Sequence, residues 1–151
     1  MSKFFFNANN KVGDTWSFQT DQSSANTFSF SVTGIDSVFD MGDGTGYQQA
    51  TPSLFAYTYA DSGTTKTVTL RTGFGGLDKI TYVGAQNDNA TGAIDLSTLK
   101  GLNQINFRTN STLSAITFPS PGNALVSLLI DGCDLSGQLD LSVFPSISGN
   151  V

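Results

Sequence analysis

The sequence predicts an all-β protein with little helix, and three observations support this prediction. In the first half, aromatic and β-branched residues alternate with polar ones, as in the run from Trp16 to Thr20. Long runs of Ala, Leu, Glu and Lys at helical spacing do not occur. In the second half, apolar residues recur at intervals of 23 to 26 residues, which is typical of a repeat architecture.

The first half contains five stretches with the composition of short strands. In chain order they are 16–20, 28–32, 38–39, 56–59 and 67–70. Turn sequences rich in Gly, Asp and Ser separate several of them, at 21–24, 42–46 and 61–63. Short strands at this spacing indicate a β-sandwich. The glycine-rich stretch Gly73–Gly76 then separates two different patterns, so we divide the chain into domains 1–74 and 75–151.

One pattern in the first domain suggests its family. A strand runs into a Gly-Asp-Gly turn and is followed by a Tyr segment, a Gly and a Val-Thr-Leu strand, at Val38–Thr45, Tyr57–Tyr59, Gly63 and Val68–Leu70. Over roughly 12–74 the chain resembles a PKD-type immunoglobulin-like domain, which implies an immunoglobulin-like β-sandwich. It departs from that family at Val38-Phe39, where a Trp is usual, and at Thr64–Lys66, which lengthen the Gly-to-Val spacing.

The Gly-Asp-Gly turn has a structural explanation. Gly42 and Gly44 supply positions for positive φ, and the Asp43 carboxylate can accept a hydrogen bond from its own turn. A Ca²⁺ site at Asp40 and Asp43 is the alternative. Ca²⁺ takes six or more oxygen ligands, so a structural turn is the favoured interpretation.

The second domain contains an internal repeat of about three units. The aligned positions are Leu77, Leu102, Leu125 and Val151; Ile80, Ile105 and Leu128; Tyr82, Phe107 and Ile130; and Ala85, Asn110 and Cys133. This alignment resembles the L-x-x-L-x-L-x-x-N/C frame of leucine-rich repeats. Further along each unit, Thr91–Ser97 aligns with Ser136–Ser142, and Ser114–Pro119 is a looser middle copy. We therefore expect a short leucine-rich-repeat solenoid. Each of its units should contain two short strands, one on each face of a flattened coil.

The chain offers little for catalysis. It has no histidine and one cysteine, Cys133, so neither a Cys–His pair nor an internal disulfide can form. The repeat places Cys133 in the same position as Ala85 and Asn110, an inward position where Cys packs and Asn binds loop backbone. We therefore interpret Cys133 as a structural residue and expect no enzymatic activity, cofactor or metal site.

Asp95 and Asp140 occupy equivalent positions in two units, and glycosidases use two carboxyl groups about 5–10 Å apart. Apolar neighbours on either side of Asp95 place it on the solvent face of its strand, so we interpret the pair as solvated.

Three further features could contribute to binding. The loops Gln86–Asn89 and Asn7–Asn10 could line a sugar or cation site, although Asn-rich loops are more often turns. Trp16 could be a platform for a sugar ring, but its place in an alternating strand favours core packing.

Composition and charge restrict the functions and partners that we expect. Charged residues make up 13% of the chain, so Ser, Thr, Asn, Gln and Gly supply most of the surface, as in β-rich proteins of cell surfaces and virus particles. The net charge is −5 and the seven basic residues are scattered, so we expect no nucleic-acid partner. No apolar run is long enough to span a membrane, so we expect no membrane insertion.

The segment from Met1 to Asn10 lacks the apolar core of a secretory signal. We therefore expect a non-enzymatic structural or receptor-facing component of a virus particle, such as a phage spike or capsid-associated protein, located in the virion. The alternative is a bacterial cell-surface adhesin or carbohydrate-binding module, which would be extracellular. A host-surface protein or glycan is the expected ligand.

The C-terminal unit lacks a recognisable polar cap. Leu135, Leu139, Leu141 and Val143 continue the apolar pattern, and a repeat array needs its last unit covered. We expect this edge to expose apolar side chains and unpaired backbone groups, and to contact other subunits of an assembly.

Overall fold

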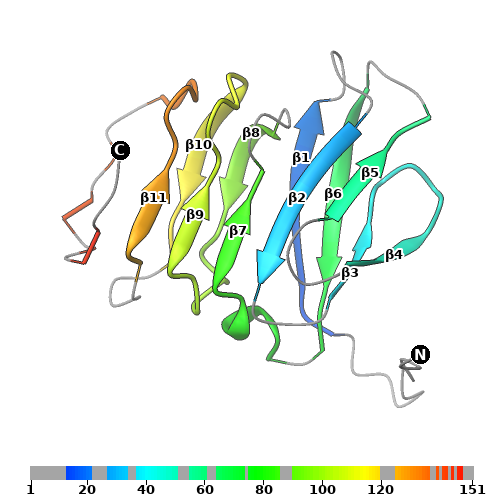
Figure 1. Cartoon of the computed structure of the whole chain (residues 1–151), viewed down its shortest axis with the longest axis horizontal. Helices are drawn as coiled ribbons and strands as arrows, with labels where there is room; N and C mark the ends of the chain where they lie inside the picture. Colours follow the sequence, from blue (N-terminus) through cyan, green and yellow to red (C-terminus); the bar gives the residue numbers. More distant parts are fainter. Residues whose placement is uncertain are drawn as a thin grey trace.

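The computed structural model describes residues 13–21, 27–33, 37–50, 55–60, 64–73, 75–85, 90–119, 125–136, 139, 141, 142, 144, 146 and 147. In this part of the chain eleven strands form two sheets, and the one helix is a 3₁₀ turn, Leu77–Lys79 (Figure 1). The predicted all-β fold with little helix is confirmed.

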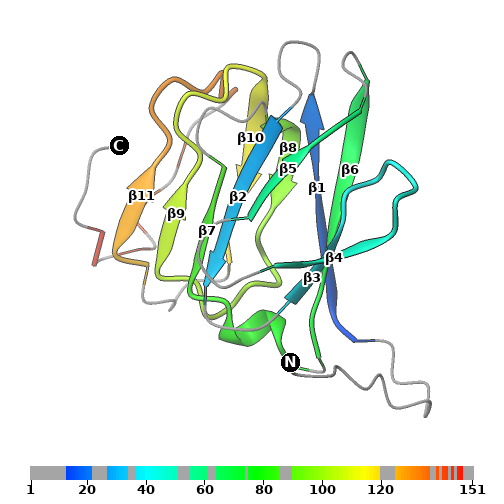
Figure 2. The ribbon, with the colours of Figure 1, turned by 45° about the vertical axis from the view of Figure 1, so that its right-hand side comes forward.

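The two sheets lie face to face (Figure 2). The six-stranded sheet has the order β10-β8-β1-β6-β3-β4, and the five-stranded sheet has the order β11-β9-β7-β2-β5. The strands of the first sheet are β1 (Thr15–Asp21), β3 (Ser37–Asp40), β4 (Tyr47–Ala50), β6 (Thr65–Arg71), β8 (Ala90–Asp95) and β10 (Leu113–Thr117). Those of the second are β2 (Thr27–Thr33), β5 (Phe55–Thr58), β7 (Tyr82–Gly84), β9 (Gln104–Asn106) and β11 (Ser127–Leu129).

The alternating pattern of the first half produces the predicted strands. In β1, Trp16, Phe18 and Thr20 are buried between the sheets, while the residues between them are exposed. The runs predicted from 28, 38, 56 and 67 onwards correspond to β2, β3, β5 and β6. Strand β4 was not predicted, because Tyr47–Ala50 contains two consecutive glutamines and no alternation of apolar residues.

Strands of the second half extend both sheets of the first. β1 pairs with β6 on one side and with β8 on the other, through Gln19↔Thr91 and Thr20↔Ala90. β2 likewise pairs with β5 and with β7. The buried side chains of both halves form one hydrophobic cluster. The repeat strands therefore continue an existing two-layer structure and do not form a separate, free-standing solenoid.

The repeat strands pair in parallel. β7, β9 and β11 follow one another in the five-stranded sheet, and β8 and β10 are neighbours in the six-stranded sheet. The first two units thus place one strand in each sheet, as predicted. The looser middle copy pairs with the first, since Ile116 lies opposite Ile94, with an irregularity between Leu113 and Ala115. Parallel strands joined by crossovers of this length follow from the repeat period.

The predicted register of the first unit is wrong by three residues. Tyr82, which was aligned with Phe107, pairs with Gln104, and Val83 pairs with Ile105. Strand alternation then turns Val83 inward, where it is fully buried, and Tyr82 outward. The equivalent buried positions are Ile80, Val83 and Ala85; Leu102, Ile105 and Phe107; and Leu125, Leu128 and Ile130.

Hydrogen bonds at the unit boundaries support the corrected register. The backbone N–H groups of Ile80, Leu102 and Ile147 each donate to the carbonyl three residues earlier, all at 3.2 Å. Leu77 therefore precedes its unit, in the 3₁₀ turn, and Ile147 makes the same backbone bond as Ile80 and Leu102. The predicted start at Val151 lies outside the described residues.

Candidate functional site

The Gly-Asp-Gly turn between β3 and β4 is held by its own side chains. Gly42 and Gly44 have φ values of 74° and 83°, as predicted. Asp43 Oδ1 accepts hydrogen bonds from the backbone N–H and the hydroxyl of Thr45, at 3.0 and 2.7 Å, and Oδ2 accepts one from the Tyr57 hydroxyl at 2.6 Å. The predicted bond from Asp43 to its own turn is confirmed.

These hydrogen bonds shift the pKa values of Asp43 and Tyr57. Desolvation acts to raise the pKa of Asp43, but the hydrogen bonds from Tyr57 and Thr45 outweigh it and lower the pKa. The same bond to Asp43 raises the pKa of the Tyr57 hydroxyl. Both carboxylate oxygens of Asp43 are therefore bonded within the fold, and Asp40 Oδ1 accepts from the Gly42 N–H at 2.9 Å. Within the described residues no three His, Cys, Asp or Glu side chains gather in one place.

Asn110 occupies the inward position predicted for it. It is fully buried, and its side-chain amide donates to the carbonyl oxygens of Ala85, Phe107 and Arg108, at 2.5, 2.8 and 3.2 Å. Its Oδ1 accepts from the backbone N–H of Ala90 at 2.8 Å. The amide thus binds backbone in both its own unit and the preceding one. Ala85 is not its equivalent, since Ala85 takes the position of Phe107 in the corrected register.

Cys133 takes the equivalent position one unit later. The half-buried thiol donates to the carbonyl oxygen of Phe107 at 2.9 Å. Burial raises the pKa of this thiol and the Asp131 charge adds to the effect, while a hydrogen bond with the Asn110 backbone opposes it. A raised pKa keeps the thiol protonated, and the protonated form is a poor nucleophile.

The side chain of Trp16 contacts the backbone of Asp95. The Asp95 carboxylate is exposed, as predicted, and accepts from the Ser97 N–H at 2.8 Å. Hydrogen bonds from the Ser97 side chain and backbone lower its pKa. Trp16 is 5% exposed, stacks on Phe18 at 5.1 Å between ring centroids, and donates its indole N–H to the Asp95 carbonyl at 2.6 Å. The interpretation of Trp16 as a core residue is confirmed.

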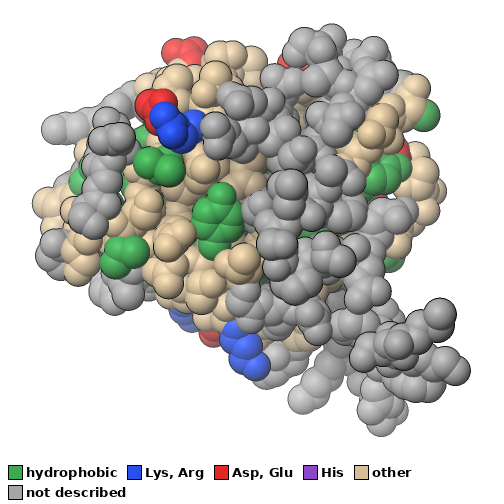
Figure 3. Space-filling model, in the orientation of Figure 1, with side chains coloured by type: hydrophobic (Ala, Val, Ile, Leu, Met, Phe, Trp, Pro, Cys, Tyr) green, Lys and Arg blue, Asp and Glu red, His purple; other side chains and the backbone are tan. Residues whose placement is uncertain are grey.

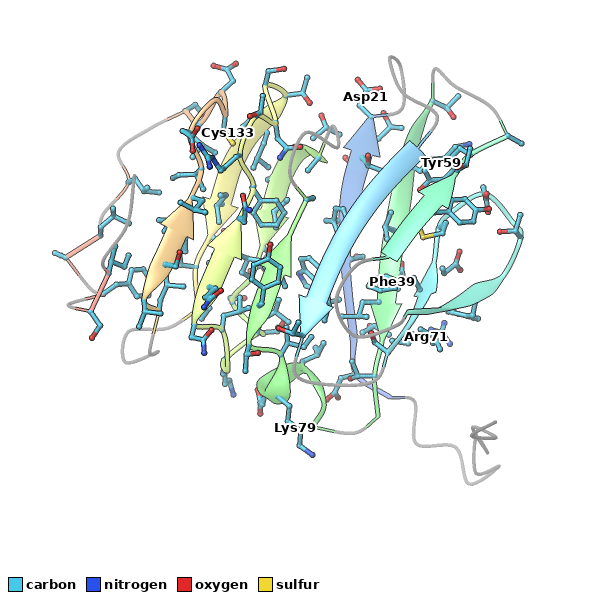
Figure 4. The ribbon with its side chains drawn as sticks, in the orientation of Figure 1. Asp21, Phe39, Tyr59, Arg71, Lys79 and Cys133 are labelled. Carbon is cyan, nitrogen blue, oxygen red and sulfur yellow. The ribbon has the colours of Figure 1, made fainter. Side chains whose placement is uncertain are left out.

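Three predicted features lie outside the described residues: Asp140, the loop Gln86–Asn89 and the loop Asn7–Asn10. The described candidates lie on different elements: Asp43 follows β3, Asp95 ends β8, and Cys133 follows β11. Figure 4 shows Cys133 among the parallel strands, away from Tyr59 in the antiparallel half. The structure therefore does not bring the candidate side chains together into one reactive site.

The predicted C-terminal edge is partly covered by its own side chains. Leu135, Leu139 and Leu141 are half-buried against the core, and Val143 lies outside the described residues. Phe144 is 3% exposed and meets the Phe118 ring edge-on at 5.5 Å. The apolar side chains of the last unit thus turn inward more than the sequence suggested.

The backbone of β11 forms one edge of the five-stranded sheet among the described strands. The carbonyls of Leu129 and Asp131 accept from Phe107 and Thr109 in the neighbouring unit, both at 2.8 Å. Because backbone groups alternate sides along a strand, those of Leu128 and Ile130 point away from β9. Among the described strands, none pairs with β11 on that side.

The outer face of the five-stranded sheet was not predicted from the sequence. Its rows are Tyr82, Gln104 and Ser127; Gly84, Asn106 and Leu129; and the ion pair between Arg108 and Asp131. Figure 3 shows this side of the molecule as mostly uncharged, with separate apolar side chains and few charges. The correct repeat register would have revealed these rows, because it assigns Tyr82 to the outside.

No protein-family model, no curated protein and no solved structure matches this chain. Among the described residues, no helix has the length and apolar character needed to cross a membrane.

Proposed function

We propose that this protein is a non-enzymatic structural and receptor-facing component of a virus particle, such as a phage spike or capsid-associated protein. One observation carries the proposal: the candidate reactive groups that the structure describes are used to hold the fold. The Asp43 carboxylate accepts a hydrogen bond within its own turn, and the Asp95 carboxylate accepts one from the backbone N–H of Ser97. The Cys133 thiol donates to a carbonyl of the neighbouring unit. A fold in which these polar side chains form internal hydrogen bonds is suited to a stable particle component.

The fold we propose combines two family resemblances. The PKD-type turn and its Tyr57 contact support an immunoglobulin-like β-sandwich in 1–74. In 75–151 the corrected frame, I-x-x-V-x-A followed by L-x-x-I-x-F and L-x-x-L-x-I, supports leucine-rich repeats joined edge to edge onto that sandwich. The buried Asn110 at the last position of its frame adds support, since it binds loop backbone.

Contacts with other subunits are proposed at the β11 edge. The outward backbone groups of Leu128 and Ile130 can pair with a strand of another chain. We also propose that nucleic acid is not a partner. Two of the described cations are engaged within the fold, since Arg108 is paired with Asp131 and Arg71 lies over the Tyr47 ring at 4.5 Å.

The alternative function is a bacterial cell-surface adhesin or carbohydrate-binding module. The uncharged polar outer face of the five-stranded sheet favours it, because such a face suits recognition of a surface ligand as well as exposure on a particle.

Peptide mass spectrometry of density-purified particles from the source culture tests the proposal. We expect peptides of this chain in the particle fraction, at a ratio to the major capsid protein that stays constant across the density peak. A constant ratio separates an assembled component from a contaminant. Recovery from a bacterial surface fraction alone would favour the adhesin, and recovery from neither fraction would refute both functions.

A further inference from the structure

The outer face of the five-stranded sheet carries an aromatic ring whose end lies over the backbone of its own strand. Tyr82 begins β7 and points outward, because its neighbour Val83 is fully buried. Two residues on, Gly84 has no side chain, and a Cβ atom built there would lie 2.8 Å from Tyr82 Cζ and would overlap the hydroxyl. The end of the ring therefore lies over Gly84, at the place that a side chain there would take.

Hydrogen-bonding side chains surround this ring on the adjacent strands. Gln104 lies directly opposite Tyr82 and is exposed, and Ser127 continues the row on β11. In the third row, Arg108 and Asp131 form a two-point ion pair, with Nε–Oδ1 at 2.7 Å and a second contact at 3.2 Å. Their side chains are 40% and 46% exposed, so both can bind a ligand while paired.

We propose that this face, which we call the Tyr82 face, binds a neutral oligosaccharide. The half-buried ring of Tyr82 offers an apolar surface for the C–H face of a pyranose, while amide, hydroxyl and paired charged groups can bind its hydroxyls. The row from Tyr82 to Ser127 crosses two strand spacings, about 10 Å, which is the length of two linked sugar rings. The inference rests on the receptor-facing role proposed above and names the chemistry of that receptor.

Charge selects a neutral glycan over an acidic one. The described rows of the Tyr82 face carry one cation and one anion, which balance each other. The whole chain carries a net charge of −5, so it repels sialylated and sulfated glycans at long range.

Calorimetry and NMR titration of the full chain test the inference with defined probes. The probes are tetrasaccharides of β-1,4-linked glucose, β-1,4-linked N-acetylglucosamine and β-1,3/β-1,4-linked galactose, with a sulfated and a sialylated tetrasaccharide as acidic comparisons. We expect saturable binding of at least one neutral probe and weaker binding of the acidic ones. Amide shifts in the bound wild-type chain should concentrate at 82–84, 104–108 and 127–131.

Three variants locate the ring contact. Tyr82→Ala should weaken binding at least about tenfold, as expected for an aromatic anchor, and Tyr82→Phe should bind nearly as well as the wild type. Gly84→Ala should weaken binding as well, because the added Cβ displaces the ring while leaving it in the chain. Tyr47→Ala is the matched control, since Tyr47 is an exposed tyrosine on β4 of the other sheet.

Absence of saturable binding to every neutral probe would overturn the inference, as would unchanged binding by Tyr82→Ala or shifts centred elsewhere. If this chain is nevertheless found in purified particles, the structural function stands and only the glycan assignment fails. Glycan binding without incorporation into particles would instead support the adhesin.

Discussion

Buried Asn110 accepts a hydrogen bond from the backbone N–H of Ala90 at 2.8 Å, which joins two successive repeat units inside the protein. The same side chain donates to backbone carbonyls of both units. A single amide therefore bonds backbone donors and acceptors of both units inside the protein.

Replacing this amide should destabilise the protein. Asn110→Ala leaves the Ala90 N–H and the Ala85 carbonyl unpaired, and we expect a loss of about 2–4 kcal/mol, since each buried unsatisfied group costs about 1–3 kcal/mol. Urea denaturation followed by tryptophan fluorescence measures the change. Thr117→Ala, at an exposed position of β10, is the control. Equal midpoints for the two variants would contradict the role assigned to Asn110.

The corrected repeat register makes a prediction about adjacent residues. Leu128 is fully buried and Ser127 is only half-buried on the outer face. Leu128→Ala, like Ile105→Ala, should cost about 2–5 kcal/mol by leaving a cavity, whereas Ser127→Ala should change stability by less than about 0.5 kcal/mol. Thermal and urea unfolding of these variants measures both values. Similar losses at 127 and 128 would show that the assigned inner and outer positions are wrong.

The thiol of Cys133 should react slowly in the folded protein, and its removal should leave binding intact. Its pKa is raised in the folded protein, so the contribution of the neutral thiol to stability is present below the ordinary thiol pKa and is lost as the pH rises through the folded value. At pH 8 we expect slower reaction with a disulfide reagent in the native state than in urea. Cys133→Ala should cost less stability than Ile105→Ala and leave glycan binding unchanged. Loss of binding in a folded Cys133→Ala variant would overturn the structural interpretation.

The hydrogen bonds to Asp43 should make the stability of the protein decrease at acidic pH. The pKa of Asp43 is lowered, so its contribution to stability is present above the ordinary Asp pKa and is lost as the pH falls through the folded value. Tyr57→Phe removes one donor and should raise the pKa of Asp43 towards its ordinary range. Carbon-detected NMR titration of the carboxyl groups measures this shift, with Asp95 as the internal control. An unchanged Asp43 titration would mean that the Tyr57 contact does not form in solution.

The repeat half should not fold by itself. β8 pairs with β1 and β7 pairs with β2, so a fragment of residues 75–151 would expose two strand edges and the core beneath them. We expect poor amide dispersion in the NMR spectrum of this fragment, and native dispersion in the whole chain. A cooperatively folded fragment would show that the boundary at Gly73–Gly76 separates independent domains.

Local patterns in the sequence determined which segments form strands. Alternation of buried and exposed residues, as in β1, depends only on neighbouring side chains and the period of two, so it is readable directly. The repeat period likewise predicted two short strands in each unit, and the position of Asn110 predicted that its side chain points inward. Side-chain chemistry also indicated that Asp43 would bind its own turn.

Tertiary structure decided the rest, because pairing between distant strands depends on backbone contacts that no local pattern encodes. The repeat frame fits the first unit twice, starting from Leu77 or from Ile80, since apolar residues recur there at intervals of three. Only the pairing of Tyr82 with Gln104 selects the second frame and turns the tyrosine outward. The joining of the two halves through β1–β8 and β2–β7 is equally nonlocal, and it is what places one core between both sheets.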